Sequence, residues 1–206
     1  MPNMFFDLEI GSNVRLADLA WIDGEDAEDG SGLGCNRDYV DLRGATWDEV
    51  DRVLGIERRL IASQTASTEL MEMREDLIQD AAKFDLLDLD LGVASATLAL
   101  SAAGCIPFTS CNGGAFGGVH SEEYPLVAFY LPQSAVDQVE RAARRSGVGL
   151  HHDQQGLVHV YAPFLSRMVM FAASLRNSGR RADRKREGLS LEPAHRADQH
   201  EQSAQG

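Results

Sequence analysis

Cysteine is scarce in this sequence: only three occur among 206 residues, at positions 35, 105 and 111. An odd and sparse set of this kind argues against the disulfide framework of a secreted domain. The first residues, MPNMFFDLEIGS, contain no basic stretch and two early acidic residues, which is not typical of a secretory signal. We therefore expect a cytoplasmic protein whose thiols are reduced.

Long apolar runs are also missing. None approaches the roughly 20 residues that a membrane-spanning helix needs, so we predict no membrane partner. Basic residues are few in the first half of the chain: residues 1–100 contain 22 acidic and 8 basic residues, a net charge of −14, whereas residues 101–206 contain 10 and 11, a net charge of +1. An acidic body repels phosphate, which argues against nucleic acid as its partner.

Residues 46–84 are predicted to form a long helix. Thr46 and Glu49 make the T-x-x-E pattern of a capping box, and apolar residues then recur at helical spacing as far as Ile78. The helix would span residues 47–83, either unbroken or interrupted in the weak central segment ASQTAST. A small domain cannot cover so long an apolar stripe, so we expect this helix to be the oligomerisation arm of a homo-oligomer.

The remainder of the sequence predicts an α+β fold. Residues 85–177 show patterns in the order helix, strand, strand, helix, strand, strand, helix. Two αββ units in tandem would give an antiparallel sheet of about four strands with helices on one face, preceded by the long helix. Residues 1–45 would form a strand and an acidic loop. Residues 178–206 are polar and lack a core-forming pattern, so we expect a disordered tail.

A glycine-rich loop, from Cys111 to Tyr124, joins the first two of these strands. A thiol becomes a nucleophile when a nearby histidine or free backbone amides lower its pKa. Cys111 is therefore a candidate nucleophile, with His120 or His152 as its base. The alternative is a small buried thiol beside a glycine turn. The catalytic-cysteine signatures of known enzyme families do not match this stretch.

The same loop is a candidate ligand site, because the amides of successive glycines can converge on an anion. The candidate ligand-binding residues are Ser110, Asn112, Gly113, Gly114 and Glu122. The segment GGAFGG does not have the spacing of a dinucleotide-binding fingerprint. The sequence therefore indicates no particular cofactor.

Metal binding has weaker support in the sequence than ligand binding at the glycine-rich loop. Cys111, His120 and either His151 or His152 are ligand types that zinc accepts, but no C-x-x-C or H-x-x-x-H pair is present, and we predict no metal site. His151 and His152 are adjacent in a predicted strand, so they must point to opposite faces of the sheet. His159, on the next predicted strand, could lie across from one of them.

The sequence SCNG at residues 110–113, followed by PLVAF at 125–129, resembles the strand–Cys-x-Gly–strand hairpin of a family of wybutosine-synthesis proteins and of bacterial proteins with a C-x-G-H element. The resemblance is confined to this hairpin. Gly114 stands where the histidine of that element would be, and the family's basic residue is missing. No function is carried over from it.

Two hypotheses follow. The first is a cytoplasmic α+β protein that binds a ligand or partner at the Cys111–Tyr124 loop and self-associates through helix 47–83. The second is a thiol-dependent enzyme with Cys111 as nucleophile and His120 or His152 as base. Neither identifies a substrate, a small ligand or a protein partner.

Overall fold

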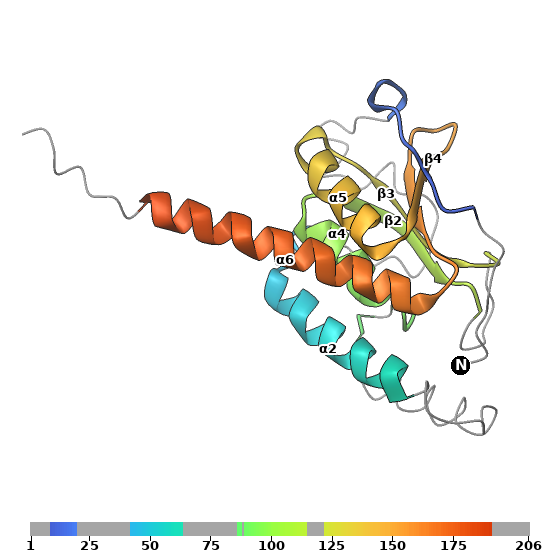
Figure 1. Cartoon of the computed structure of the whole chain (residues 1–206), viewed down its shortest axis with the longest axis horizontal. Coiled ribbons are helices and arrows are strands. Elements are labelled where there is room, and N and C mark those ends of the chain that lie inside the picture. Colours follow the sequence, from blue (N-terminus) through green and yellow to red (C-terminus); the bar gives the residue numbers. More distant parts are fainter. Residues whose placement is uncertain (1–8, 20–41, 64–85, 88, 115–121, 191–206) are drawn as a thin grey trace, which may run out of the picture.

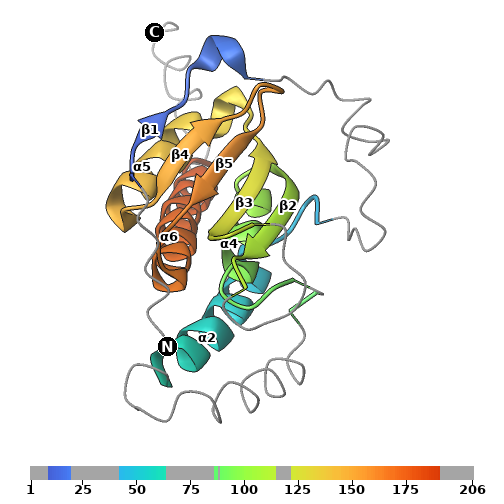
Figure 2. The same cartoon turned by 90° about the vertical axis from the view of Figure 1, so that its right-hand side faces the viewer.

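The computed structural model describes residues 9–19, 42–63, 86–87, 89–114 and 122–190. These residues form two layers (Figure 1): a β-sheet, and a layer of helices that covers one of its faces. Figure 2 looks onto the sheet, with the helices behind it. The apolar core lies between the two layers.

The sheet has five strands in the order β1-β4-β5-β3-β2. Their bounds are Ser12–Asn13 for β1, Ile106–Asn112 for β2, Pro125–Tyr130 for β3, Gly149–His152 for β4 and Val158–Tyr161 for β5. Strands β2 to β5 pair antiparallel, and β1 pairs parallel with β4.

The α+β class is therefore confirmed, but the prediction of an antiparallel sheet of about four strands is wrong in detail. The sheet is mixed and has a fifth strand, because a segment near the N-terminus adds to the outer edge of β4. That edge would otherwise expose unpaired backbone groups. The amide of Leu150 donates to the carbonyl oxygen of Gly11 at 2.8 Å.

In the described part of the chain, the second layer consists of the helices α2 (Trp47–Ser63), α4 (Ala94–Ala102), α5 (Val136–Ser146) and α6 (Leu165–Ser190). Two short 3₁₀ turns, Leu16–Asp18 and Gln133–Ala135, accompany them. Helix α4 is apolar nearly all round and is buried on all sides except near its end, as its sequence predicts. Among the described residues, none of the helices combines the length and apolar character of a membrane span.

Helix α2 begins with the predicted capping box. The amide of Thr46 donates to Glu49 Oε2 at 2.7 Å, and the amide of Glu49 donates to Thr46 Oγ1 at 3.3 Å. The predicted helix of residues 47–83 is matched only as far as Ser63, and residues 64–85 lie outside the described residues.

The apolar side of α2 is covered within the chain. Val50, Val53 and Leu54 are buried, and α2 packs against α4 and α6. This part of the helix therefore offers no free apolar stripe to a second copy. Self-association through helix 47–83 stays a prediction.

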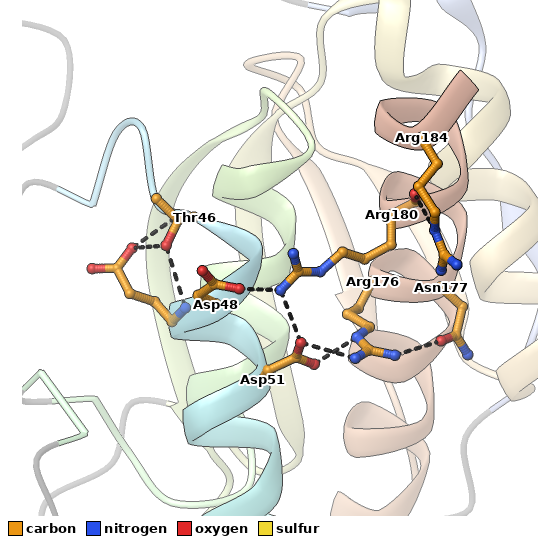
Figure 3. Close-up of polar contacts among 8 residues, drawn as sticks. Thr46, Asp48, Asp51, Arg176, Asn177, Arg180 and Arg184 are labelled. Atoms are coloured by element: carbon orange, nitrogen blue, oxygen red, sulfur yellow. Dashed lines mark hydrogen bonds and ion pairs between the residues drawn. The ribbon is translucent and has the colours of Figure 1, made fainter. Parts of the chain in front are cut away.

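Helix α6 continues well past Asn177, where its sequence pattern predicts an end. Residues 178–190, which we expected to be disordered, are helical, and residues 191–206 lie outside the described residues. The first turn of this extension contacts α2 (Figure 3). Arg176 Nη2 donates to Asp51 Oδ2 at 2.8 Å, and Arg180 pairs with both Asp51 and Asp48. The Arg176 guanidinium holds the pKa of Asp51 below its ordinary value.

A close contact accompanies these ion pairs. A Cβ atom at Gly179 would lie 2.1 Å from Cζ2 of Trp47, so only glycine lets the indole of α2 lie against α6. Trp47 is half-buried and packs against the core. The first part of the predicted tail is thus a packing surface for α2.

A chain that ends at Asn177 should be measurably less stable than the whole protein. It loses the surface of α6 that lies under Trp47, a loss of about 2 kcal/mol, so we expect its melting temperature to fall by about 4–8 °C. The ion pairs of Arg180 are lost with it. Thermal unfolding followed by circular dichroism measures this shift. A chain that ends at Ser190 is the control and should melt within about 2 °C of the whole protein. Equal melting of the two shortened chains would contradict the packing role of residues 178–184.

Candidate functional site

The face of the sheet that the helices leave open is the candidate site. Val127, Phe129, Val158, Val160 and Leu150 belong to the core between the layers. Side chains alternate along a strand, so their neighbours point to the opposite face. These neighbours are Leu126, Ala128, His159, Tyr161 and His151, of which Leu126 and Ala128 are buried and the three ring residues are half-buried. We call this surface the open face; in Figure 2 it is turned towards the viewer.

Four rings follow one another across the open face, and we call them the ring row: Tyr124, Tyr161, His151 and His159. The ring centroids of Tyr124 and Tyr161 are 5.9 Å apart, and those of Tyr161 and His151 are 5.3 Å apart, both pairs edge to face. His151 and His159 stack with centroids 4.7 Å apart. The rings come from β4, β5 and the residue before β3, and all four side chains are half-buried.

Strand register explains this arrangement. Gly149 on β4 lies directly opposite Tyr161 on β5. A Cβ atom at Gly149 would lie 2.1 Å from Cζ of Tyr161, so the tyrosine ring occupies the space that a side chain on β4 would fill. The Tyr161 hydroxyl donates to the carbonyl oxygen of Glu9 at 2.8 Å. The Tyr161 ring thus lies against Gly149 of β4 and contacts His151.

The far end of the ring row is fixed by Asp153. Its Oδ1 accepts hydrogen bonds from the amides of Gln155 at 2.8 Å and Leu157 at 3.0 Å, which closes the turn between β4 and β5. Its Oδ2 lies 3.3 Å from His159 Nε2. Burial alone would raise the pKa of Asp153, but the hydrogen bonds from His159 and the two amides lower it below its ordinary value. Asp153 is therefore ionised at neutral pH and orients His159.

The ionisation of the rings follows from their surroundings. Burial lowers the pKa of His151, and the neighbouring His159 lowers it further, so His151 is neutral at pH 7. Burial also raises the pKa of Tyr124, as do the nearby Glu122, Tyr161 and Glu123. The row thus presents an uncharged imidazole and an uncharged phenol at neutral pH.

Cys111 lies at the border of the open face. It pairs with Leu126, so its side chain points to that face, but it is only 5% exposed. Its Sγ accepts a hydrogen bond from the amide of Gly113 at 3.3 Å, and the amide of Gly114 donates to Asn112 Oδ1 at 3.1 Å. Both amides that were predicted to converge on an anion are thus directed to side chains of the loop itself.

The backbone conformation explains why Gly113 and Gly114 are glycines. Gly113 and Gly114 have φ of 67° and 73°, which side-chain-bearing residues rarely adopt. A Cβ atom at Gly113 would lie 2.7 Å from the backbone of Tyr124. Asn112 is buried and its Nδ2 donates to the carbonyl oxygen of Leu91 at 3.3 Å. Asn112 therefore links the described start of the loop to the segment before α4.

The other predicted site residues are scattered. Ser110 pairs with Val127 and points towards the helix layer, and Glu122 is exposed just before β3. His120 lies outside the described residues. No group of three or more metal-ligating side chains that could hold an ion occurs among the residues that the structure describes.

Cys111 and His152 are not brought together. His152 pairs with Val158, a core residue, so the two side chains point to opposite faces of the sheet. Their strands, β2 and β4, are separated by β5 and β3, which is roughly 14 Å by strand spacing alone. His152 instead faces Asp18: its Nε2 is buried and lies 3.6 Å from Asp18 Oδ2. This geometry does not support His152 as the base for Cys111.

The sequence could have revealed part of this site. The opposite facing of His151 and His152 was predicted, and His159 does lie across from His151. Gly149, Tyr161, Tyr124 and Asp153 were missed as members of one cluster. The usable signal was the hairpin length, which fixes the register and so pairs Gly149 with Tyr161.

Comparison of the chain with models of protein families, with curated proteins and with solved structures finds no significant match. The fold and the ring row are therefore the observations on which a function can be argued.

Proposed function

We propose that the protein acts by binding a small molecule with a planar group, and that the ring row on the open face is the binding surface. The observation that carries this proposal is the unbroken contact of Tyr124, Tyr161, His151 and His159 across three segments of the chain. Ligand sites are lined mainly by apolar and aromatic side chains with a few fixed polar groups, and Asp153 and His159 supply such groups here.

The site shares a border with the Cys111–Tyr124 loop, which the sequence indicated as the ligand-binding segment. Cys111 and Tyr124 are its two ends, and both border the open face. The described ends of the loop and the ring row would therefore belong to one binding region, and residues 115–121 lie outside the described residues. The hypothesis of a thiol-dependent enzyme gains no support from the position of His152, so binding is the function that the geometry favours.

Cross-strand ring contacts also stabilise sheets without binding anything. The two roles make different predictions for substitutions that keep the fold. A binding surface loses its ligand when one ring is removed, whereas a purely structural row loses only stability. The test must therefore measure binding and folding separately.

Benzamide and benzamidine, two flat probes of one shape, should shift the NMR signals of the His151 and His159 ring protons. Tyr161→Leu and His159→Leu should each raise the dissociation constant at least about fivefold, the scale of one aromatic contact. Tyr130→Leu is the matched control, because Tyr130 pairs with Phe108 instead and should leave binding unchanged. Thermal unfolding of each variant confirms the fold.

Two results would contradict the proposal. One is that neither probe shifts the histidine signals of the whole protein. The other is that both ring-row variants, while folded, bind the probes as the unchanged protein does.

A further inference from the structure

The strands contain neither acidic nor basic residues, and the basic residues after residue 100 are concentrated in two helices. The five strands contain no lysine or arginine, whereas ten of the eleven basic residues after residue 100 lie in α5 and α6. Helices α5 and α6, which carry these residues, lie on the helix side of the sheet, behind the open face in Figure 2.

Carboxylates, by contrast, border the ring row at both ends. Glu122 and Glu123 are exposed just before Tyr124, and they act on its phenol strongly enough to help raise its pKa. At the other end Asp153 contacts His159 through Oδ2. Next to β1, Arg15 is paired with Asp18 at 2.7 Å. The open face thus combines ring surfaces with carboxylates that no arginine or lysine of the strands neutralises.

We infer that the ligand of the ring row is a small planar organic cation, of the amidinium or guanidinium type; this rests on the proposed function above. A cation over an aromatic face is attracted by the negative charge of the π-system, and the bordering carboxylates add to the attraction. The same field repels carboxylates and phosphates, so anionic metabolites and nucleotides are poor ligands for this face.

The inference is tested by comparing benzamidine, which is a cation, with benzamide, which is neutral and has the same outline. At constant low salt, benzamidine should bind the whole protein at least about tenfold more tightly, as followed by the His151 and His159 ring signals. Raising the sodium chloride concentration from about 50 to 300 mM should weaken benzamidine and leave benzamide unchanged.

Glu122→Gln combined with Glu123→Gln should reduce the preference for benzamidine about threefold without changing the affinity for benzamide. Asp137→Asn is the matched control: its carboxylate is 87% exposed on α5, on the helix side, and its loss should change neither affinity.

The outcomes separate this inference from the proposed function. If both probes bind the ring row with equal affinity, the binding function stands and the preference for a cation is wrong. If benzamidine shifts only signals outside the ring row, the inference is also wrong, because the cation then binds at unrelated surface carboxylates. If neither probe reaches the ring row, the proposed function itself fails.

Discussion

Replacing Glu57 with alanine should lower the free energy of unfolding by at least about 3 kcal/mol. Glu57 belongs to α2 and is fully buried, and its carboxyl group accepts hydrogen bonds from the start of α4. Oε1 accepts hydrogen bonds from the amides of Gly92 at 2.7 Å and Ala94 at 3.1 Å, and Oε2 accepts from the amide of Ser95 at 3.2 Å and from the Ser95 hydroxyl.

The first amides of a helix have no partner inside the helix, and Val93, which precedes α4, provides no side-chain cap. Glu57 therefore replaces the missing cap from another helix. Without it, the buried amides of Gly92 and Ser95 lose their acceptor, whereas the amide of Ala94 keeps the carbonyl oxygen of Asp90 at 3.1 Å. Urea unfolding of the Glu57→Ala variant measures the loss. The control is Glu140→Gln, which replaces a carboxylate near the surface of α5 and should change the stability by less than about 0.5 kcal/mol. A loss below about 1 kcal/mol for Glu57→Ala would contradict the capping role.

The same residue predicts a dependence on pH. Burial raises the pKa of Glu57 above its ordinary value, although the hydrogen bonds from Ser95, Gly92 and Ala94 oppose this. The folded protein then binds a proton more tightly than the unfolded chain. The contribution of protonated Glu57 to stability is complete below about pH 4, the range of an unperturbed glutamate. It is lost as the pH rises through the raised pKa of the folded state. The stability of the protein relative to Glu57→Gln should therefore decrease as the pH rises above about 4, and an increase would show that the pKa is lowered instead.

Gly149→Ala is expected to have the second large effect, because it should both destabilise the fold and displace a ring of the ring row. The new methyl group would occupy the position of the Tyr161 ring, whose nearest atoms are 2.1 to 2.5 Å from it. The ring must turn away from β4 and from His151. Overpacking of this kind costs about 1–3 kcal/mol. Thermal unfolding measures the loss, and the contacts between the ring protons of Tyr161 and His151 should disappear from the NMR spectrum.

A double variant shows whether the clash is the cause. In a Tyr161→Ala background the space is empty, so Gly149→Ala should cost almost nothing there. An equal cost in both backgrounds would mean that the glycine is needed for its backbone alone. Gly55→Ala is the matched control: nothing lies within 4 Å of its Cβ position in α2, so the exchange should stabilise the helix by up to about 1 kcal/mol.

Much of the fold could be predicted because its signals are local. The capping box at Thr46 marks the start of α2, and Gly147, in the left-handed conformation, ends α5 where the sequence indicated. The four longer strands follow from alternation and turn residues. Strand β1 could not be found this way, since two residues carry no pattern and their pairing depends on the free edge of β4.

The features that were missed depend on distant partners. The end of α6 is polar and lacks a core pattern, yet Gly179 and Arg180 are held by α2. Glu57 looks like a surface residue in the sequence, and only the approach of α4 explains its burial. In the site, the pairing of His151 with His159 was predictable from one hairpin. The role of Cys111 was not, because the sequence does not say whether its thiol is exposed.

The contact between α2 and α6 has a consequence for how the chain folds. Asp51 and Arg176 are 125 positions apart, and Asp48 and Arg180 are 132 apart. Such contacts form only after long loops have closed, and proteins rich in them fold slowly. The hairpin of β4 and β5 and helix α5 need only neighbouring residues and can form early. The ion pairs between α2 and α6 must form late. The contact of Glu57 with Gly92 spans only 35 positions, so α2 and α4 can pair first and wait for α6 to complete their packing.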